Sequence, residues 1–148
     1  MSLAIVYTRA ALGIEAPLIT VEVHLSNGLP GLTMVGLPET TVKEARDRVR
    51  SALINSGYAF PAKKITINLA PADLPKEGGR YDLPIALALL VASEQLNTTR
   101  LNQYEFVGEL ALTGGLRGVP GAIPSAMEAI KAGRRIVVSS DNAAEVGL

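Results

Sequence analysis

The sequence predicts an α+β domain with a mixed α/β arrangement, in which a mixed sheet is packed by about three helices. Three strand patterns precede the first helix pattern, and strand and helix patterns alternate after residue 41. This order combines hairpins with strand–helix–strand crossovers, which excludes a doubly wound sheet. The 148 residues contain no internal repeat or low-complexity linker, so residues 1–148 are expected to form a single domain.

The first three strands are expected at residues 3–9, 17–25 and 31–37. The second strand shows the clearest alternation of apolar and polar side chains, which indicates one buried face. Its apolar face carries Ile19, Val21, Val23 and Leu25, and its polar face carries Thr20, Glu22 and His24. The Asn27-Gly28 pair predicts the turn that follows this strand.

A helix is expected from Thr41 to Ser56. Thr41 and Glu44 fit a capping box, and Gly57 supplies the stop signal. One face of this helix is apolar at helical spacing, so the helix should pack on the sheet. The residues of that face are Val42, Ala45, Val49, Ala52 and Leu53. A fourth strand is expected at 64–69, where apolar and polar residues alternate again.

A central helix is expected from Asp82 to Gln95, with Asp82 as its N-cap. Its residues 85–92 are apolar on every side, which predicts burial against more than one neighbour. The later elements are a hairpin of 105–113 with 116–119, a helix at 124–132 and a strand at 135–139. Arg134 and Arg135, at the beginning of this last strand, are expected to be solvated. Residues 141–148 could begin another helix.

Composition excludes several classes of function. The 14 basic and 14 acidic residues balance, so bulk charge gives no support for nucleic-acid binding. The absence of cysteine excludes disulfides and thiolate chemistry, and the single histidine leaves no metal site to expect. There is no apolar run of membrane-spanning length and no signal-peptide pattern, so we expect a cytoplasmic domain without a membrane partner.

Familiar catalytic motifs are also absent. The sequence has no Walker A phosphate loop and no Gly-x-Ser-x-Gly nucleophile elbow. The Gly114–Gly118 segment joins two expected strands and so does not fit the dinucleotide fingerprint. Any nucleotide hydrolysis would therefore have to come from outside these residues.

Three segments in order resemble the proteolytic domain of Lon proteases. They are Pro75-Lys-Glu-Gly78 before an apolar helix, the Gly-Glu-containing run 106–120, and the run 126–133. The resemblance implies the Lon-protease-domain fold, which is shared with a domain of a ribosomal small-subunit protein. It also implies a serine at Tyr81 or Asp82 and a lysine at Ile123 or Ser125. Since neither residue type stands there, the Ser–Lys dyad is missing and the resemblance implies the fold without the protease.

A second resemblance covers nearly the whole chain. The runs 4–14, 31–50 and 68–87 are similar to the N-terminal domain of the YifB/ComM family, which is magnesium-chelatase-like. In that family the domain precedes an AAA+ ATPase module that binds ATP and magnesium, and the resemblance implies a hexameric DNA helicase that promotes branch migration during natural transformation. It therefore implies an accessory domain without a cofactor of its own, whose partners are its ATPase module and neighbouring subunits, with DNA as a further candidate. The AAA+ module lies outside these 148 residues.

Two groups of charged residues are candidates for contact with such partners. The loop before the central helix carries Asp73, Lys76, Glu77 and Arg80, which could form a binding surface or simply a structural connection. Lys43, Arg46 and Arg50 share one face of the first helix by their i, i+3 and i+7 spacing. They could contact DNA phosphates, although the acidic residues between them are equally typical of a solvated face.

Three functions therefore remain open. The first is a non-catalytic accessory domain of a magnesium-chelatase-like AAA+ ATPase that aids hexamer assembly or DNA handling. The second is a hydrolase of Lon-like fold that uses Asp82 or Asp73 as a base, with Lys76 as its partner. The third is a module that binds a peptide or a protein.

Overall fold

The computed structural model describes residues 2–146. Its main sheet has six strands in the order β3-β4-β2-β1-β5-β8, and both parallel and antiparallel pairs occur. The strands are β1 (Leu3–Arg9), β2 (Leu18–Ser26), β3 (Gly31–Val35), β4 (Lys64–Ala70), β5 (Tyr104–Phe106) and β8 (Arg135–Val137). The predicted mixed α/β class is therefore confirmed.

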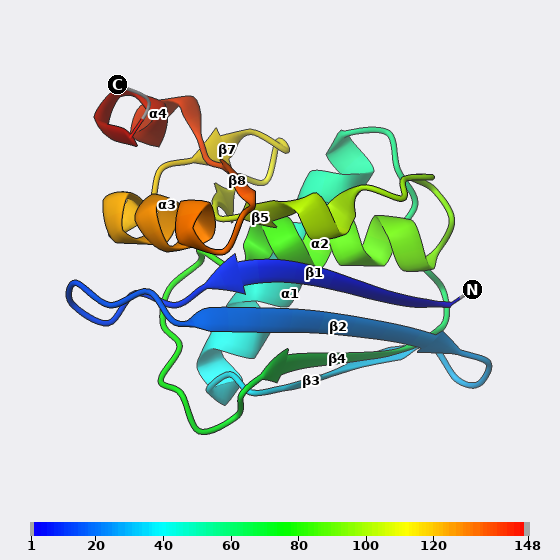
Figure 1. Ribbon diagram of the computed structural model, residues 1–148. Coiled ribbons are helices and arrows are strands. Elements are labelled where there is room, and N and C mark those ends of the chain that lie inside the picture. Colours follow the sequence, from blue (N-terminus) through cyan, green and yellow to red (C-terminus); the bar gives the residue numbers. More distant parts are fainter. Residues whose placement is uncertain (1, 147–148) are drawn as a thin grey trace.

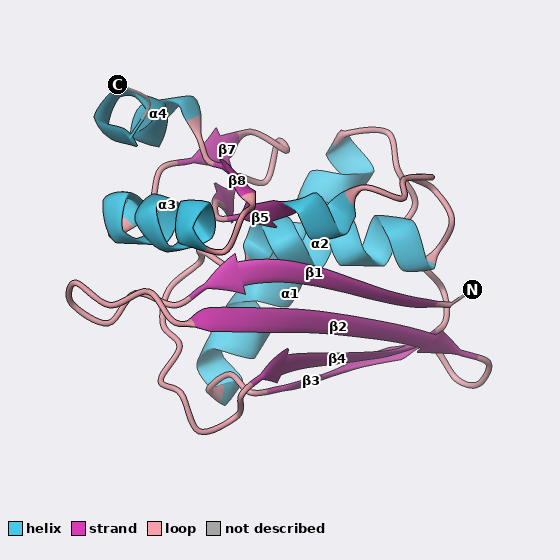
Figure 2. Ribbon diagram, in the orientation of Figure 1, coloured by secondary structure: helices cyan, strands magenta, loops and turns pink. Residues whose placement is uncertain are grey.

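Four α-helices occur among the described residues, and the fourth falls where the sequence suggested a further helix. They are α1 (Glu39–Asn55), α2 (Asp82–Ala92), α3 (Ala122–Lys131) and α4 (Ser140–Val146), and a short 3-10 helix, η1, spans Leu101–Gln103. Figures 1 and 2 show α1 and α2 behind the long strands, whereas α3 and α4 lie at the end of the sheet near β5 and β8. The helix expected at 141–148 corresponds to α4, and residues 147–148 lie outside the described part.

The core lies between the long strands and the helices α1 and α2. All four residues of the predicted apolar face of β2 are buried, and so are Ile65, Ile67 and Leu69 of β4. The antiparallel register aligns the two faces, since Val21 is opposite Leu69 and Val23 is opposite Ile67. Alternation in the sequence thus predicted the buried face of the sheet correctly.

Helix α1 begins two residues before the predicted start. The carbonyl oxygen of Pro38 accepts the N–H of Val42 at 3.0 Å, and no side chain caps the helix. Thr41 and Glu44 therefore lie inside the helix, and the predicted capping box is wrong. The stop at Gly57 is confirmed, because this residue has a φ of +88°, which L side chains rarely adopt.

Helix α2 is buried on several sides, as the prediction required. Asp82, however, is its first residue and caps nothing with its side chain, so the predicted N-cap is wrong. Its carboxylate faces Arg48 of α1 and the N–H of Leu110, while the first backbone N–H groups of the helix donate to the carbonyl oxygens of Gly79 and Gly108. The physical reason is a stronger donor, since Arg48 offers a charged hydrogen-bond partner there.

The predicted hairpin is shorter than expected. The strands β6 (Glu109–Leu110) and β7 (Leu116–Arg117) form a separate two-stranded sheet, whereas β5 belongs to the main sheet. After β5 the N–H of Val107 still donates to Val137 of β8, whereas the N–H of Gly108 donates to Arg80, outside the main sheet. Residues 105–108 are thus held by other segments and not by a hairpin partner.

Candidate functional site

The loop between β4 and α2 carries both exposed and buried charged side chains. Asp73 and Glu77 are exposed, as a binding surface would require. Lys76 and Arg80 are only 2% and 4% exposed, so these two cations do not form an exposed surface and fit the structural alternative. The reason is that both find backbone acceptors inside the fold.

The Lys76 side chain forms hydrogen bonds within its own loop. Its Nζ donates to the carbonyl oxygens of Pro71 and Leu74. Burial lowers the pKa of Lys76, and the nearby charge of Asp73 acts in the opposite direction. An ammonium held in this way by its own loop stabilises the loop, and it is not oriented toward Asp82 as a catalytic partner.

Arg80 connects three separate parts of the chain. Its Nε donates to the carbonyl oxygen of Arg9 at 2.9 Å, and its two terminal nitrogens donate to Pro120 at 2.6 Å and to the Oγ of Ser125 at 2.8 Å. Burial lowers the pKa of Arg80. Among the residues that the structure describes, no carboxylate forms an ion pair with this guanidinium.

The four positions named by the Lon resemblance have different surroundings. Ser125 is fully buried at the start of α3 and bonds to Arg80, whereas Ile123 is 46% exposed. Tyr81 is buried, and its hydroxyl has no hydrogen-bond partner among the described residues. Burial raises the pKa of Tyr81 to about 12. The resemblance places the dyad on the segment before α2 and on the start of α3. These two segments are in contact in the structure, through the hydrogen bond from Arg80 to Ser125.

Asp82 forms a buried ion pair with Arg48 of α1. The Arg48 Nε lies 2.6 Å from one carboxylate oxygen and a terminal nitrogen lies 3.2 Å from the other, while the N–H of Leu110 donates to the first at 3.1 Å. Burial raises the pKa of Asp82 to about 6, although these hydrogen bonds favour the charged form. The pair joins α1, α2 and β6, so Asp82 has a structural role in this geometry.

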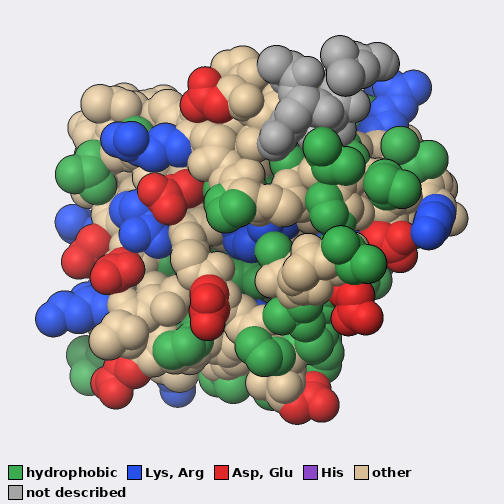
Figure 3. Space-filling model, turned by 90° about the vertical axis from the view of Figure 1, so that its left-hand side faces the viewer, with side chains coloured by type: hydrophobic (Ala, Val, Ile, Leu, Met, Phe, Trp, Pro, Cys, Tyr) green, Lys and Arg blue, Asp and Glu red, His purple; other side chains and the backbone are tan. Residues whose placement is uncertain are grey.

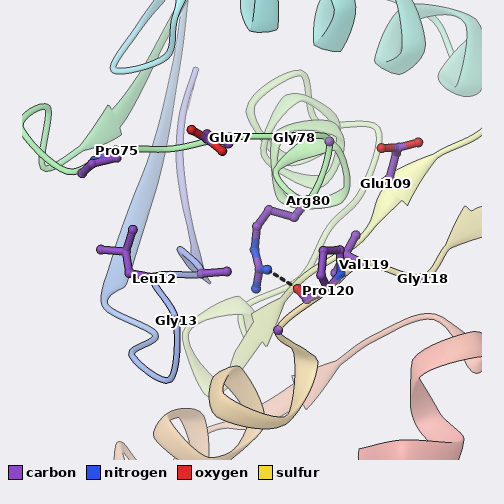
Figure 4. A pocket seen from close by; sticks show the side chains of 13 residues that line it. Leu12, Gly13, Pro75, Glu77, Gly78, Arg80, Glu109, Gly118, Val119 and Pro120 are labelled. Atoms are coloured by element: carbon purple, nitrogen blue, oxygen red, sulfur yellow. Dashed lines mark hydrogen bonds between the residues drawn. The ribbon is translucent and has the colours of Figure 1, made fainter.

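A cavity of about 710 Å³ lies beside the loop. Residues 11–13, 75, 77–80, 109 and 118–121 line it, and Figure 4 shows the Arg80 side chain extending into the space between Leu12 and Pro120. Its volume is in the range of small-molecule sites. Glycine forms much of the wall, so the backbone is accessible there.

The predicted basic face of α1 gains two residues from another segment. Arg46 and Arg50 line a groove of about 460 Å³ together with Phe60 and Lys63, and Lys43 is exposed on the same helix. The Arg50 guanidinium lies 5.9 Å from the centre of the Phe60 ring. The helical spacing predicted the two arginines, but Phe60 and Lys63 lie on the far side of a turn and gave no periodic signal.

A second buried charge cluster joins β1, β5 and the start of β8. Glu105 is fully buried and accepts two hydrogen bonds from Arg9, at 2.6 and 2.9 Å, and one from Arg134 at 3.1 Å. Arg134 also stacks on the Tyr7 ring at 4.0 Å. The expectation that Arg134 is solvated is therefore wrong, because this carboxylate draws it onto the sheet.

Residues 2–146 contain neither a metal-ligand cluster nor a membrane-spanning helix. No group of three or more His, Asp or Glu side chains comes together there in a way that could hold a metal ion. None of the helices between residues 2 and 146 has both the length and the apolar composition needed to cross a membrane.

Comparison with known proteins identifies the class of this domain. Residues 21–142 match the family model described as subunit ChlI of Mg-chelatase, which makes it a magnesium-chelatase-like domain. Within this class, the chain belongs to the YifB/ComM family.

Three relatives support this assignment over the whole chain. The chain is 82% identical to the uncharacterized protein YifB of Salmonella typhimurium, 64% identical to the competence protein ComM of Haemophilus influenzae and 38% identical to a protein of Mycobacterium bovis. Each match covers 100% of this chain but only 29%, 29% and 30% of the relative. The chain thus spans less than a third of the length of these relatives.

Proposed function

We propose that this domain is the N-terminal accessory domain of a magnesium-chelatase-like AAA+ ATPase of the ComM type, and that it guides single-stranded DNA toward the motor. The groove beside α1 carries this proposal, because Arg46, Arg50 and Lys63 line it together with Phe60. Cations that follow a phosphate backbone, combined with an aromatic ring for base stacking, are typical of single-strand binding without sequence preference. The name of the relative ComM, a competence protein, agrees with DNA handling.

The ATPase activity belongs, in this proposal, to a module outside these residues. That module would bind ATP and magnesium and would form the hexamer of a branch-migration helicase in the cytoplasm. The domain itself would take part by contact, with the Lon-like fold serving as a scaffold without a Ser–Lys dyad. The hydrolase alternative gains no support from the site, because Lys76 donates to carbonyl oxygens and Asp82 pairs with Arg48.

A row of exposed apolar side chains on α3 supports contact with a neighbouring subunit. Ile123, Met127 and Ile130 are 46%, 55% and 70% exposed and lie along one side of the helix by their spacing. Figure 3, which views the molecule from the side where α3 lies, shows hydrophobic side chains gathered among charged ones. We include hexamer assembly in the proposed function for this reason.

Fluorescence anisotropy of labelled single-stranded and forked DNA tests the DNA part of the proposal. The 148-residue chain should bind, and its affinity should fall as salt rises. The variant K43A/R46A/R50A should bind at least tenfold more weakly and should reduce the slope of log affinity against log salt by about two. A matched variant, R100A/K131A/R135A, removes three charges from other elements and should bind as the parent does.

Two outcomes would contradict DNA handling by this groove. One is the absence of binding at low salt, and the other is an equal loss in both triple variants. Either result would leave subunit assembly as the proposed role, which sedimentation of the full-length protein with Met127→Lys tests separately. That substitution places a charge in the apolar row and should weaken the hexamer.

A further inference from the structure

Arg80 is a buried cation whose charge is not balanced inside the fold. It is 4% exposed, and its three hydrogen bonds go to two carbonyl oxygens and one hydroxyl. Removing a charge from water costs several kcal/mol unless an opposite charge compensates for it. The neutral acceptors satisfy only part of the guanidinium, which carries five N–H donors in a planar fork.

The cavity beside Arg80 has the shape of a site for a small group. Its volume is about 710 Å³, and glycines at 13, 78, 79, 118 and 121 form part of its wall. A Cβ added to Gly121 would lie 3.0 Å from the Ala11 side chain and 3.4 Å from a terminal nitrogen of Arg80, so a side chain there would fill this space. Gly121 also precedes α3, and no side chain caps that helix.

The start of α3 adds to the positive potential near Arg80. Helix N-termini carry free N–H groups and a partial positive charge, which favours an anion. Here the helix start is combined with a buried guanidinium that reaches into the same cavity (Figure 4). Both sources of positive potential thus lie at one end of the same open cavity.

The other end of the cavity is acidic, and this limits the charge of the ligand. Glu77 and Glu109 both line the wall, and Figure 4 shows them on two sides of the cavity, away from the tip of Arg80. A phosphate dianion would be repelled by these two carboxylates. A single carboxylate requires only the one cation that the site provides, and the apolar parts of Leu12, Pro75 and Val119 would contact the chain that carries it.

We propose that this cavity binds a carboxylate group through the positive charge of the Arg80 guanidinium and the N-terminus of α3. The carboxylate can come from a small organic acid or from the end of a polypeptide chain. This site lies on other elements than the basic groove beside α1, and it is independent of DNA binding.

Nitrogen-15 NMR titration of the 148-residue chain tests the proposal. The probes are acetate, the peptide N-acetyl-Ala-Gly-Ala with a free carboxylate, the same peptide with an amide end, and inorganic phosphate. Acetate and the free-acid peptide should shift the amide signals of Gly78, Gly79 and Gly121, whereas the amide-ended peptide should not. At least tenfold tighter binding of the free-acid peptide than of acetate would identify a chain end as the source, and equal binding would identify small acids.

Three variants separate a ligand site from a structural arginine. Arg80→Gln should weaken binding at least tenfold, because a neutral amide replaces the charged hydrogen-bond donor of the site. Glu77→Gln should strengthen binding by about two- to fivefold, the range expected for an exposed charge. The matched control Asp73→Asn removes an exposed carboxylate of the same loop that does not line the cavity, and it should leave the affinity unchanged.

Several results would overturn the proposal. They are the absence of shifts at these glycines, equal shifts with the amide-ended peptide, or tighter binding of phosphate than of acetate. If Arg80→Gln does not fold, Glu77→Gln decides the question in its place. An affinity for the free-acid peptide that does not change in Glu77→Gln would then refute the site.

Discussion

Replacing Asp82 by asparagine should change the way in which stability depends on pH. Burial raises the pKa of this carboxyl group from 3.8 to about 6. Between these values the folded state holds a proton that the unfolded state has released. Protonated Asp82 therefore stabilises the fold below about pH 4, and this contribution is lost as the pH rises through about 6.

The size of the effect follows from the pKa shift. Two pKa units at about 1.4 kcal/mol each give about 3 kcal/mol between pH 4 and pH 7. Arg48 opposes the shift by pairing with the charged form, but its side chain is 22% exposed while that of Asp82 is fully buried. Desolvation of the carboxylate is therefore the larger influence, as the raised pKa indicates.

Urea denaturation at pH 4, 5, 6 and 7, followed by circular dichroism, measures this effect. The quantity of interest is the free energy of unfolding of the parent minus that of Asp82→Asn, because other carboxylates cancel in the difference. We expect this difference to fall by about 3 kcal/mol from pH 4 to pH 7. Asparagine keeps the shape of the side chain and an oxygen that can accept from Leu110, so the variant should fold.

Asp73→Asn is the control, since it removes an exposed carboxylate outside the ion pair. The free energy of unfolding of Asp73→Asn should stay within about 0.5 kcal/mol of the parent's at every pH. The reasoning about Asp82 is refuted if the free energy of unfolding of the parent minus that of Asp82→Asn is constant or rises with pH. A rise would mean that pairing with Arg48 outweighs burial and holds the carboxyl pKa below its ordinary value.

The remaining predictions concern stability and are measured by thermal and chemical unfolding. Glu105→Ala should lose about 3–5 kcal/mol, because it leaves two arginines without their buried partner; a loss below about 1 kcal/mol would contradict this role. Leu89→Ala should lose about 2–5 kcal/mol through a cavity in the core, since Leu89 is fully buried; an unchanged midpoint would show that α2 repacks. Gly36→Ala should cost more than Gly79→Ala, because the new Cβ would lie 2.3 Å from a backbone oxygen in the first case and 2.2 Å from the movable end of a glutamate in the second. The opposite order would show that the backbone at residue 36 adjusts easily.

The sequence predicted the features that depend on local periodicity. Alternation located β2 and its buried face, and the 3.6-residue period located the buried side of α1, because both patterns repeat within a few residues. The ends of the elements were less predictable. The start of α1 depends on a backbone hydrogen bond to Pro38, which no capping residue announces.

The charged clusters could not be predicted, because they join distant segments. Glu105 is 96 residues from Arg9, and Arg80 is 45 residues from Ser125. A cation in a Gly- and Pro-rich loop has the same sequence signature whether it ends in solvent or in the core. The resemblance to Lon proteases pointed to the segments that carry Arg80 and Ser125, but it named Tyr81 and Asp82 for the first of them.

The cluster around Glu105 also sets an order for events during synthesis. When the ribosome has made the first hundred residues, β1 to β4, α1 and α2 are all present, and Arg9 already ends the strand on which the rest will be built. Its acidic partner is made only later, and Arg134 later still. Residues 1–104 of the chain therefore carry a cation that is without its counter-ion until Glu105 is translated.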